Sequence, residues 1–168
     1  MTHKTCFAIS GSCPDGTHIL MLDIDTVKTK DVMMEIEEFM DGIIKEYGLS
    51  DVYVIKTMNG FNLFSLDKIP FNLIKQIGKQ SKLCDKQFLD LGYKRGYYDL
   101  RTGRDKSFLY KMQGSLKKRY MKSNMHRLSF NLAFDMDVKK DELFDNSTQL
   151  PIVQYESDKH GYYEMEDE

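Results

Sequence analysis

The stretch that decides the fold is HILMLDID at residues 18–25, an apolar run that ends in two aspartates. An unbroken apolar run of this length is typical of a central strand covered on both faces. Residues i and i+2 of a strand point to the same face, so Asp23 and Asp25 place two carboxylates side by side. Their repulsion costs stability unless a cation offsets it, and the pair therefore predicts a Mg²⁺ or Mn²⁺ site. The alternative is that the pair only ends the strand, with Asp25 capping the next helix.

The neighbouring segments predict alternating strands and helices. Residues 4–10 indicate a first strand, and residues 32–47 repeat apolar side chains at helical spacing up to a stop at Gly48. Residues 51–57 and 61–66 predict two strands joined at Asn59-Gly60, a dipeptide that favours hairpin turns with positive φ. Helices are predicted after Pro70 and over residues 85–94.

The remaining segments predict three further strands. Residues 96–101 and 107–112 resemble a hairpin, and residues 127–134 alternate apolar and polar side chains. The fold class is therefore α+β: one domain with an RRM-like mixed or antiparallel sheet backed by helices. We assign this domain to residues 1–137. Residues 138–168 are expected to form an acidic, partly disordered C-terminal segment, with residues 150–155 as the exception.

Charge is strongly segregated along the chain, although its net value is only −2. Residues 94–134 hold eleven basic and two acidic residues, and residues 135–168 hold eleven acidic and three basic ones. A basic segment of this density favours a polyanionic partner such as nucleic acid or nucleotide phosphate. The alternative is a solvated face that the acidic segment neutralises internally. The three cysteines lack metal-ligand spacing, and no signal peptide or membrane span is recognisable, which predicts a cytoplasmic protein.

Four short motifs follow one another within residues 17–106. They are LDID at 22–25, TMNGFN at 57–62, the pair Cys84-Asp85, and GYYDLR at 96–101 followed by Lys106. Their order and spacing resemble the archaeo-eukaryotic primase superfamily, the primase-polymerases of archaeal, plasmid and viral replication, in the form of a compact catalytic core. The resemblance implies a nucleotidyltransferase that makes DNA or RNA primers on a single-stranded template from nucleoside triphosphates. A replicative helicase is a further implied partner.

The resemblance also implies roles for individual residues. Two Mg²⁺ or Mn²⁺ ions would be held by the catalytic carboxylates Asp23, Asp25 and Asp85, with Asp99 as an alternative third acid. Nucleotide phosphates would contact Asn62, Lys56, Arg101, Arg104 and Lys106. The nucleic-acid backbone would follow Lys117, Lys118, Arg119 and Lys122. Asn62 departs from the family pattern, which has histidine there; asparagine donates a hydrogen bond but carries no positive charge.

Other functions stay open beside the enzyme. One is a non-catalytic nucleic-acid-binding module that uses the basic segment and the tyrosines of an RRM-like sheet. Another is a degenerate primase-like accessory protein of replication, in which Asn62 marks lost activity. A third is a protein-interaction factor whose acidic segment competes for a basic partner surface.

Overall fold

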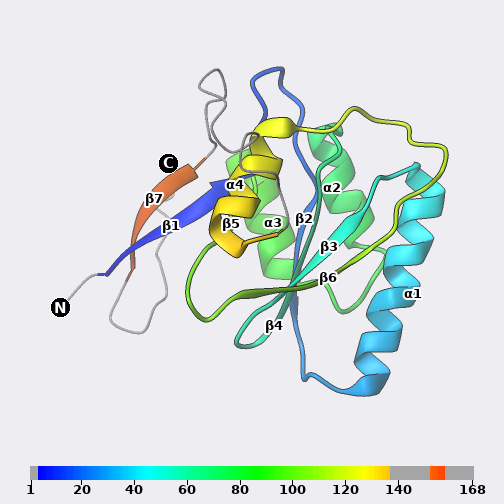
Figure 1. Ribbon diagram of the computed structural model, residues 1–168, viewed down its shortest axis with the longest axis horizontal. Coiled ribbons are helices and arrows are strands. Elements are labelled where there is room, and N and C mark those ends of the chain that lie inside the picture. The colour runs from blue at the N-terminus through cyan, green and yellow to red at the C-terminus, as the bar shows by residue number, and fades with distance from the viewer. Residues whose placement is uncertain (1–3, 137–151, 158–168) are drawn as a thin grey trace.

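Two antiparallel sheets organise residues 4–136 and 152–157, the part of the chain that the computed structural model describes (Figure 1). The larger sheet has the strand order β2-β4-β3-β6, and the smaller has the order β5-β1-β7. The strands are β1 Lys4–Ser10, β2 Met21–Asp25, β3 Val52–Lys56, β4 Gly60–Ser65, β5 Asp99–Arg101, β6 Ser107–Met112 and β7 Ile152–Ser157. The helices are α1 Lys30–Tyr47, α2 Phe71–Gly78, α3 Lys86–Arg95 and α4 Asn124–Phe134. The predicted α+β class is confirmed.

The apolar run around β2 forms the centre of the core. Met21, Leu22 and Ile24 are fully buried, because helices cover both faces of the larger sheet. On one face, Leu22 lies beside Gly78 of α2 and Leu89 of α3. On the other face, the Phe130 ring of α4 stacks on Phe64 of β4. At the end of β2, Asp23 is half-buried and Asp25 is exposed.

Local signals set the bounds of α1 and of the first hairpin. The Thr29 side chain, and not Asp25, caps α1 by accepting a hydrogen bond from the Val32 N–H, and Gly48 ends the helix at φ 65°. The hairpin at Asn59-Gly60 is confirmed, but for a different reason than a turn with positive φ. A Cβ at Gly60 would lie 1.8 Å from the Ile24 carbonyl oxygen, so the close approach of β2 requires glycine there.

Two strand predictions are wrong. Residues 96–112 do not pair as a hairpin: β5 pairs with β1, and β6 pairs with β3, so residues 102–106 cross from one sheet to the other. Residues 127–134 belong to α4, which begins after the capping side chain of Ser123 and ends at Asp135 in the left-handed conformation. Capping at both ends favours the helix over the strand that the short alternation of apolar and polar residues predicted.

Part of the predicted C-terminal segment belongs to the fold. The exception made for residues 150–155 overlaps β7, which pairs antiparallel with β1 along its whole length. The other residues of the predicted acidic segment lie outside the described residues. The boundary placed at residue 137 therefore separates β7 from a sheet to which it is hydrogen-bonded.

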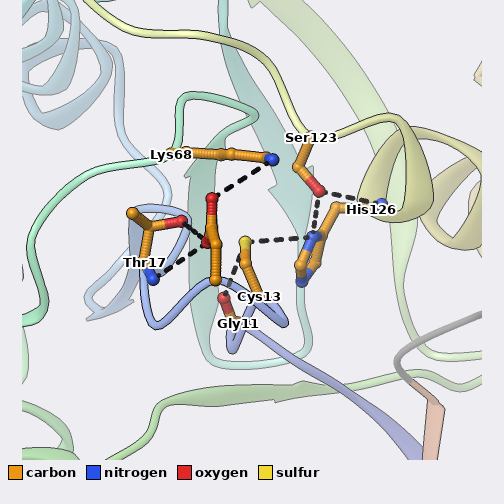
Figure 2. Close-up of polar contacts among 7 residues, drawn as sticks. Gly11, Cys13, Thr17, Lys68, Ser123 and His126 are labelled. Atoms are coloured by element: carbon orange, nitrogen blue, oxygen red, sulfur yellow. Dashed lines mark hydrogen bonds and ion pairs between the residues drawn. The ribbon is translucent and has the colours of Figure 1, made fainter.

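A buried histidine connects α4 to the end of β1, and Figure 2 shows its contacts with Ser123 and Cys13. The His126 Nε2–H donates to the Ser10 carbonyl oxygen at 2.8 Å, while Nδ1 accepts from the Ser123 hydroxyl at 2.5 Å. The Cys13 Sγ lies 4.0 Å from the same Nδ1. Burial is the main cause that lowers the pKa of His126 to about 4, and burial also raises the pKa of the Cys13 thiol. The Cys13 and His126 side chains are therefore neutral, and they do not form an ion pair between thiolate and imidazolium.

We expect buried His126 to contribute less to the stability of the fold in mild acid. Because the His126 pKa is lowered from 6.5 to about 4, the unfolded chain binds the proton more tightly. The contribution to stability is complete above pH 6.5 and is lost as the pH falls towards 4, by about 2 kcal/mol between pH 7 and pH 5. Urea unfolding of the wild type and His126→Leu at both pH values measures it. The difference between the two proteins should shrink by that amount in acid, and a constant difference contradicts the assignment.

Candidate metal centre

Three carboxylates converge at the C-terminal end of β2. One oxygen each of Asp23, Asp25 and Asp85 lies within 4.8 Å of the others. Asp23 and Asp25 come from one face of β2, and Asp85 is the N-cap residue of α3. The Asp85 N–H donates to the Asp23 carbonyl oxygen at 2.7 Å, and Cys84 forms a β-bridge with Ile24. The start of α3 is thereby held along the edge of β2, which brings the third carboxylate to the other two.

The alternative third acid, Asp99, lies elsewhere. It is on β5, opposite Ser10 of β1, in the smaller sheet. Its side chain is only 2% exposed and forms an ion pair with Arg95 at 3.7 Å. Asp99 is therefore a structural carboxylate with its own cation, and the geometry favours Asp85 as the third acid.

Burial and crowding of like charge disfavour ionisation in this cluster. Burial, followed by the neighbouring charge of Asp25, raises the pKa of Asp23 to about 6, although Lys106 acts in the opposite direction. Burial and then the charge of Asp85 also raise the pKa of Asp25. Because negative charge is held here at a cost, a bound cation would be stabilised by the same three groups.

A polar pair extends the cluster across the sheet. Asn62 lies directly opposite Asp23 in the register of β4 and β2. Its Nδ2 donates to Asp23 Oδ1 at 2.8 Å, and Lys106 Nζ donates to Asn62 Oδ1 at 2.8 Å. Burial and then the charge of Arg101 lower the pKa of Lys106 to about 8. The sequence marked Asn62 and Lys106 as separate phosphate-binding residues, whereas the structure joins them to each other and to the acidic cluster.

The other predicted phosphate-binding residues take no part in these two hydrogen bonds. Arg101 lies at the end of β5, where it influences Lys106 electrostatically and donates to Asp105 at 2.9 Å. Arg104 is exposed in the connection between β5 and β6. Lys56 is the exposed last residue of β3. Its neighbour Ile55 pairs with Asn62, so strand alternation points Lys56 to the opposite face of the sheet.

The basic residues predicted for nucleic-acid binding lie at the other end of the larger sheet. The register pairs Asp25 with Gly60 at the acidic end, and Val52 with Met112 at the far end. The chain leaves the sheet after Met112, and residues 113–122 run past the end of α1, where the Arg119 N–H donates to the Gly48 carbonyl oxygen. Four basic side chains of this segment are exposed: Lys117, Lys118, Arg119 and Lys122.

The residues present suit a hard divalent cation. Carboxylate oxygens are the ligands that Mg²⁺ and Mn²⁺ prefer. Cys84 directly precedes Asp85, and burial followed by the charge of Asp23 raises the pKa of its thiol to about 12.

Comparisons with protein families, curated proteins and solved structures found no match to this chain. The primase resemblance therefore stays a prediction that rests on the motif residues. Among the described residues, no helix combines the length and apolar character that crossing a membrane requires.

Proposed function

We propose that this chain is a metal-dependent nucleotidyltransferase of the primase type. The observation that carries the proposal is the convergence of three carboxylates from β2 and α3, with one oxygen of each within 4.8 Å of the others. The proximity of Lys106 and Arg101 supports it, because both are cations suited to nucleotide phosphates. Mg²⁺ or Mn²⁺ would be the cofactor, and a single-stranded template and nucleoside triphosphates would be the ligands.

The chemistry would consist mainly of positioning and charge neutralisation. Asp23, Asp25 and Asp85 would hold the divalent ions, which when bound neutralise the triphosphate. Lys106 and Arg101 would orient the phosphates. The primer 3′-oxygen would attack the α-phosphorus, the bond to the bridging oxygen would break, and pyrophosphate would leave. Asp85, the N-cap residue of α3, would help to accept the proton of the 3′-hydroxyl.

Asp85→Asn tests this function. Asparagine caps helices as well as aspartate does, so α3 should persist while one charged ligand is lost. We expect the variant to lose most of the thermal stabilisation by Mn²⁺ and to incorporate labelled nucleotide on single-stranded templates at least about 100-fold more slowly. Asp90→Asn is the matched control, because Asp90 is an exposed acid on the same helix. Equal activity in both variants would contradict the proposal.

A non-catalytic nucleic-acid-binding module is the second candidate. The observation that favours it is the exposed basic segment at the far end of the sheet from the carboxylates. We expect Lys117→Gln/Lys118→Gln to weaken single-stranded DNA binding about equally for every sequence, and to reduce the slope of log affinity against log salt by about 1–2. Filter binding at several salt concentrations measures this. An unchanged slope would remove this segment from the interface.

A further inference from the structure

An exposed asparagine lies in the turn that joins β3 to β4. Met58 and Asn59 are the two residues of this turn, and both are exposed. The Thr57 N–H closes the turn by donating to the Gly60 carbonyl oxygen at 3.0 Å. Every other asparagine of the sequence is followed by a residue larger than glycine. The Asn59 side-chain amide is therefore the one whose next backbone nitrogen carries no shielding side chain.

The Gly60 nitrogen faces the turn and not β2. The N–H and the C=O of a strand residue point to the same side, so the Gly60 N–H lies towards Thr57, as the Gly60 carbonyl oxygen does. The hydrogen bond to β2 comes from the residue before it, because the Asn59 carbonyl oxygen accepts from the Thr26 N–H at 2.9 Å. Opening the turn at Thr57 is therefore enough to let the Gly60 nitrogen reach the Asn59 side chain, and the pairing of β4 with β2 need not break.

We propose that Asn59 is a site of spontaneous deamidation in the folded protein. The Gly60 nitrogen attacks Asn59 Cγ and gives up its proton to water, the Cγ–Nδ2 bond breaks, and ammonia leaves as a succinimide ring closes. Water then opens the ring. Attack of water at Cγ gives aspartate, and attack at the main-chain carbonyl carbon gives isoaspartate. No atom is oxidised or reduced, and the reaction needs neither a metal ion nor the proposed enzyme activity.

The two products would affect the neighbouring end of β2 differently. Aspartate keeps the backbone path and adds one negative charge beside Gly60, which lies opposite Asp25 in the register of β2 and β4. Isoaspartate routes the backbone through Cγ and takes the carbonyl oxygen that accepts from Thr26 out of it. Gly60 has no room to move towards β2, since a Cβ there would lie 1.8 Å from the Ile24 carbonyl oxygen. We therefore expect isoaspartate to destabilise this end of the sheet more than aspartate does.

Incubation of the folded protein at pH 8, followed by trypsin and mass spectrometry, tests the proposal. Cleavage after Lys56 and Lys68 yields one peptide with both Asn59 and Asn62. Asn62 is only 3% exposed within β4 and serves as the internal control. Asn59 should gain the mass that separates an acid from an amide, in two products that chromatography resolves, while Asn62 stays unchanged. The rate at Asn59 should lie within about tenfold of its rate in the urea-unfolded chain, because an exposed turn opens at little cost in free energy.

Asn59→Gln and Asn59→Asp are the matched variants. Glutamine keeps the amide but would have to close a larger ring, so this variant should gain no mass. Asn59→Asp carries the charge of the first product with a normal backbone, so urea unfolding of this variant and of incubated wild type separates the effect of charge from that of isoaspartate. A sample digested without incubation corrects for conversion during digestion.

Three results would overturn the proposal. Conversion of Asn59 more than about 100-fold slower in the folded protein than in urea would show that the fold protects the turn. Equal conversion of Asn62 would show that neither the turn nor Gly60 directs the reaction. An equal gain of mass in this peptide of Asn59→Gln would place the reacting amide at another residue.

Discussion

Asp23→Asn is expected to make the metal-free protein more stable by about 2–3 kcal/mol at pH 8. The Asp23 pKa is raised from 3.8 to about 6 in the folded protein, so the unfolded chain carries the negative charge more readily. A group of this kind contributes stability in full below pH 4, and the contribution is lost as the pH rises through 6. At pH 8 the Asp23 carboxyl is ionised in the folded wild type, which is destabilised by the full amount. Asparagine carries no charge and avoids this destabilisation, and its Oδ1 can still accept the Asn62 hydrogen bond.

Urea unfolding at pH 8 and pH 4, in chelator and then in Mn²⁺, measures this effect. The gain should vanish at pH 4, where the wild-type carboxyl is protonated. Saturating Mn²⁺ should abolish most of this gain at pH 8, because an ion at 100 times its dissociation constant adds about 2.7 kcal/mol to the wild type only.

Glu46→Gln supplies the matched control for Asp23→Asn. It removes one negative charge at an exposed position of α1, outside the cluster, and should change stability by less than about 0.5 kcal/mol. A stability gain in Asp23→Asn that is equal at both pH values would show that the carboxylate is not the cause. A loss of stability at pH 8 would contradict the crowding of charge at this site.

Phe130→Ala is expected to cost about 3–5 kcal/mol, the largest loss predicted for a single side chain. The Phe130 ring is 0% exposed and stacks on Phe64 with 3.7 Å between ring centroids. Its removal leaves a cavity between α4 and the larger sheet and takes away an aromatic pair as well. Equilibrium unfolding in urea at neutral pH measures the loss.

Leu132→Ala turns this experiment into a test of the secondary structure of α4. Leu132 is 52% exposed on the helix, so its truncation should cost less than about 1 kcal/mol. In the strand that the alternation predicts, residues 130 and 132 would share one face and both would be buried. Similar large losses for the two variants would favour that strand and contradict the helix.

Local sequence signals determined the parts of the fold whose contacts lie close in the chain. The apolar run before Asp23 suited a buried strand, the periodicity of residues 32–47 and the stop at Gly48 set α1, and Asn59-Gly60 marked the hairpin. Each of these signals acts through neighbouring residues, by side-chain periodicity or by backbone conformation. The pairing of Asp23 with Asp25 on one face also follows from spacing alone.

Partner choice between distant segments required the tertiary structure. The hairpin predicted for residues 96–112 and the strand predicted for residues 127–134 were wrong, because hydrogen-bonding partners and buried faces depend on segments far away in the chain. Burial, too, is a tertiary property, so the sequence could not state how strongly Asp23 resists ionisation.

In the acidic cluster, one feature followed from the sequence and another only from the tertiary structure. The sequence by itself determined that Asp23 and Asp25 present two carboxylates together at the end of a strand, because residues two apart in a strand share a face. It left Asp85 and Asp99 as alternatives for the third acid. Only the tertiary structure decided between them: the bridge from Cys84 to Ile24 holds Asp85 beside β2, while Asp99 lies in the other sheet, buried against Arg95 of α3. Sixty residues of chain separate Asp25 from Asp85, and only packing of α3 against the edge of β2 brings their carboxylates together.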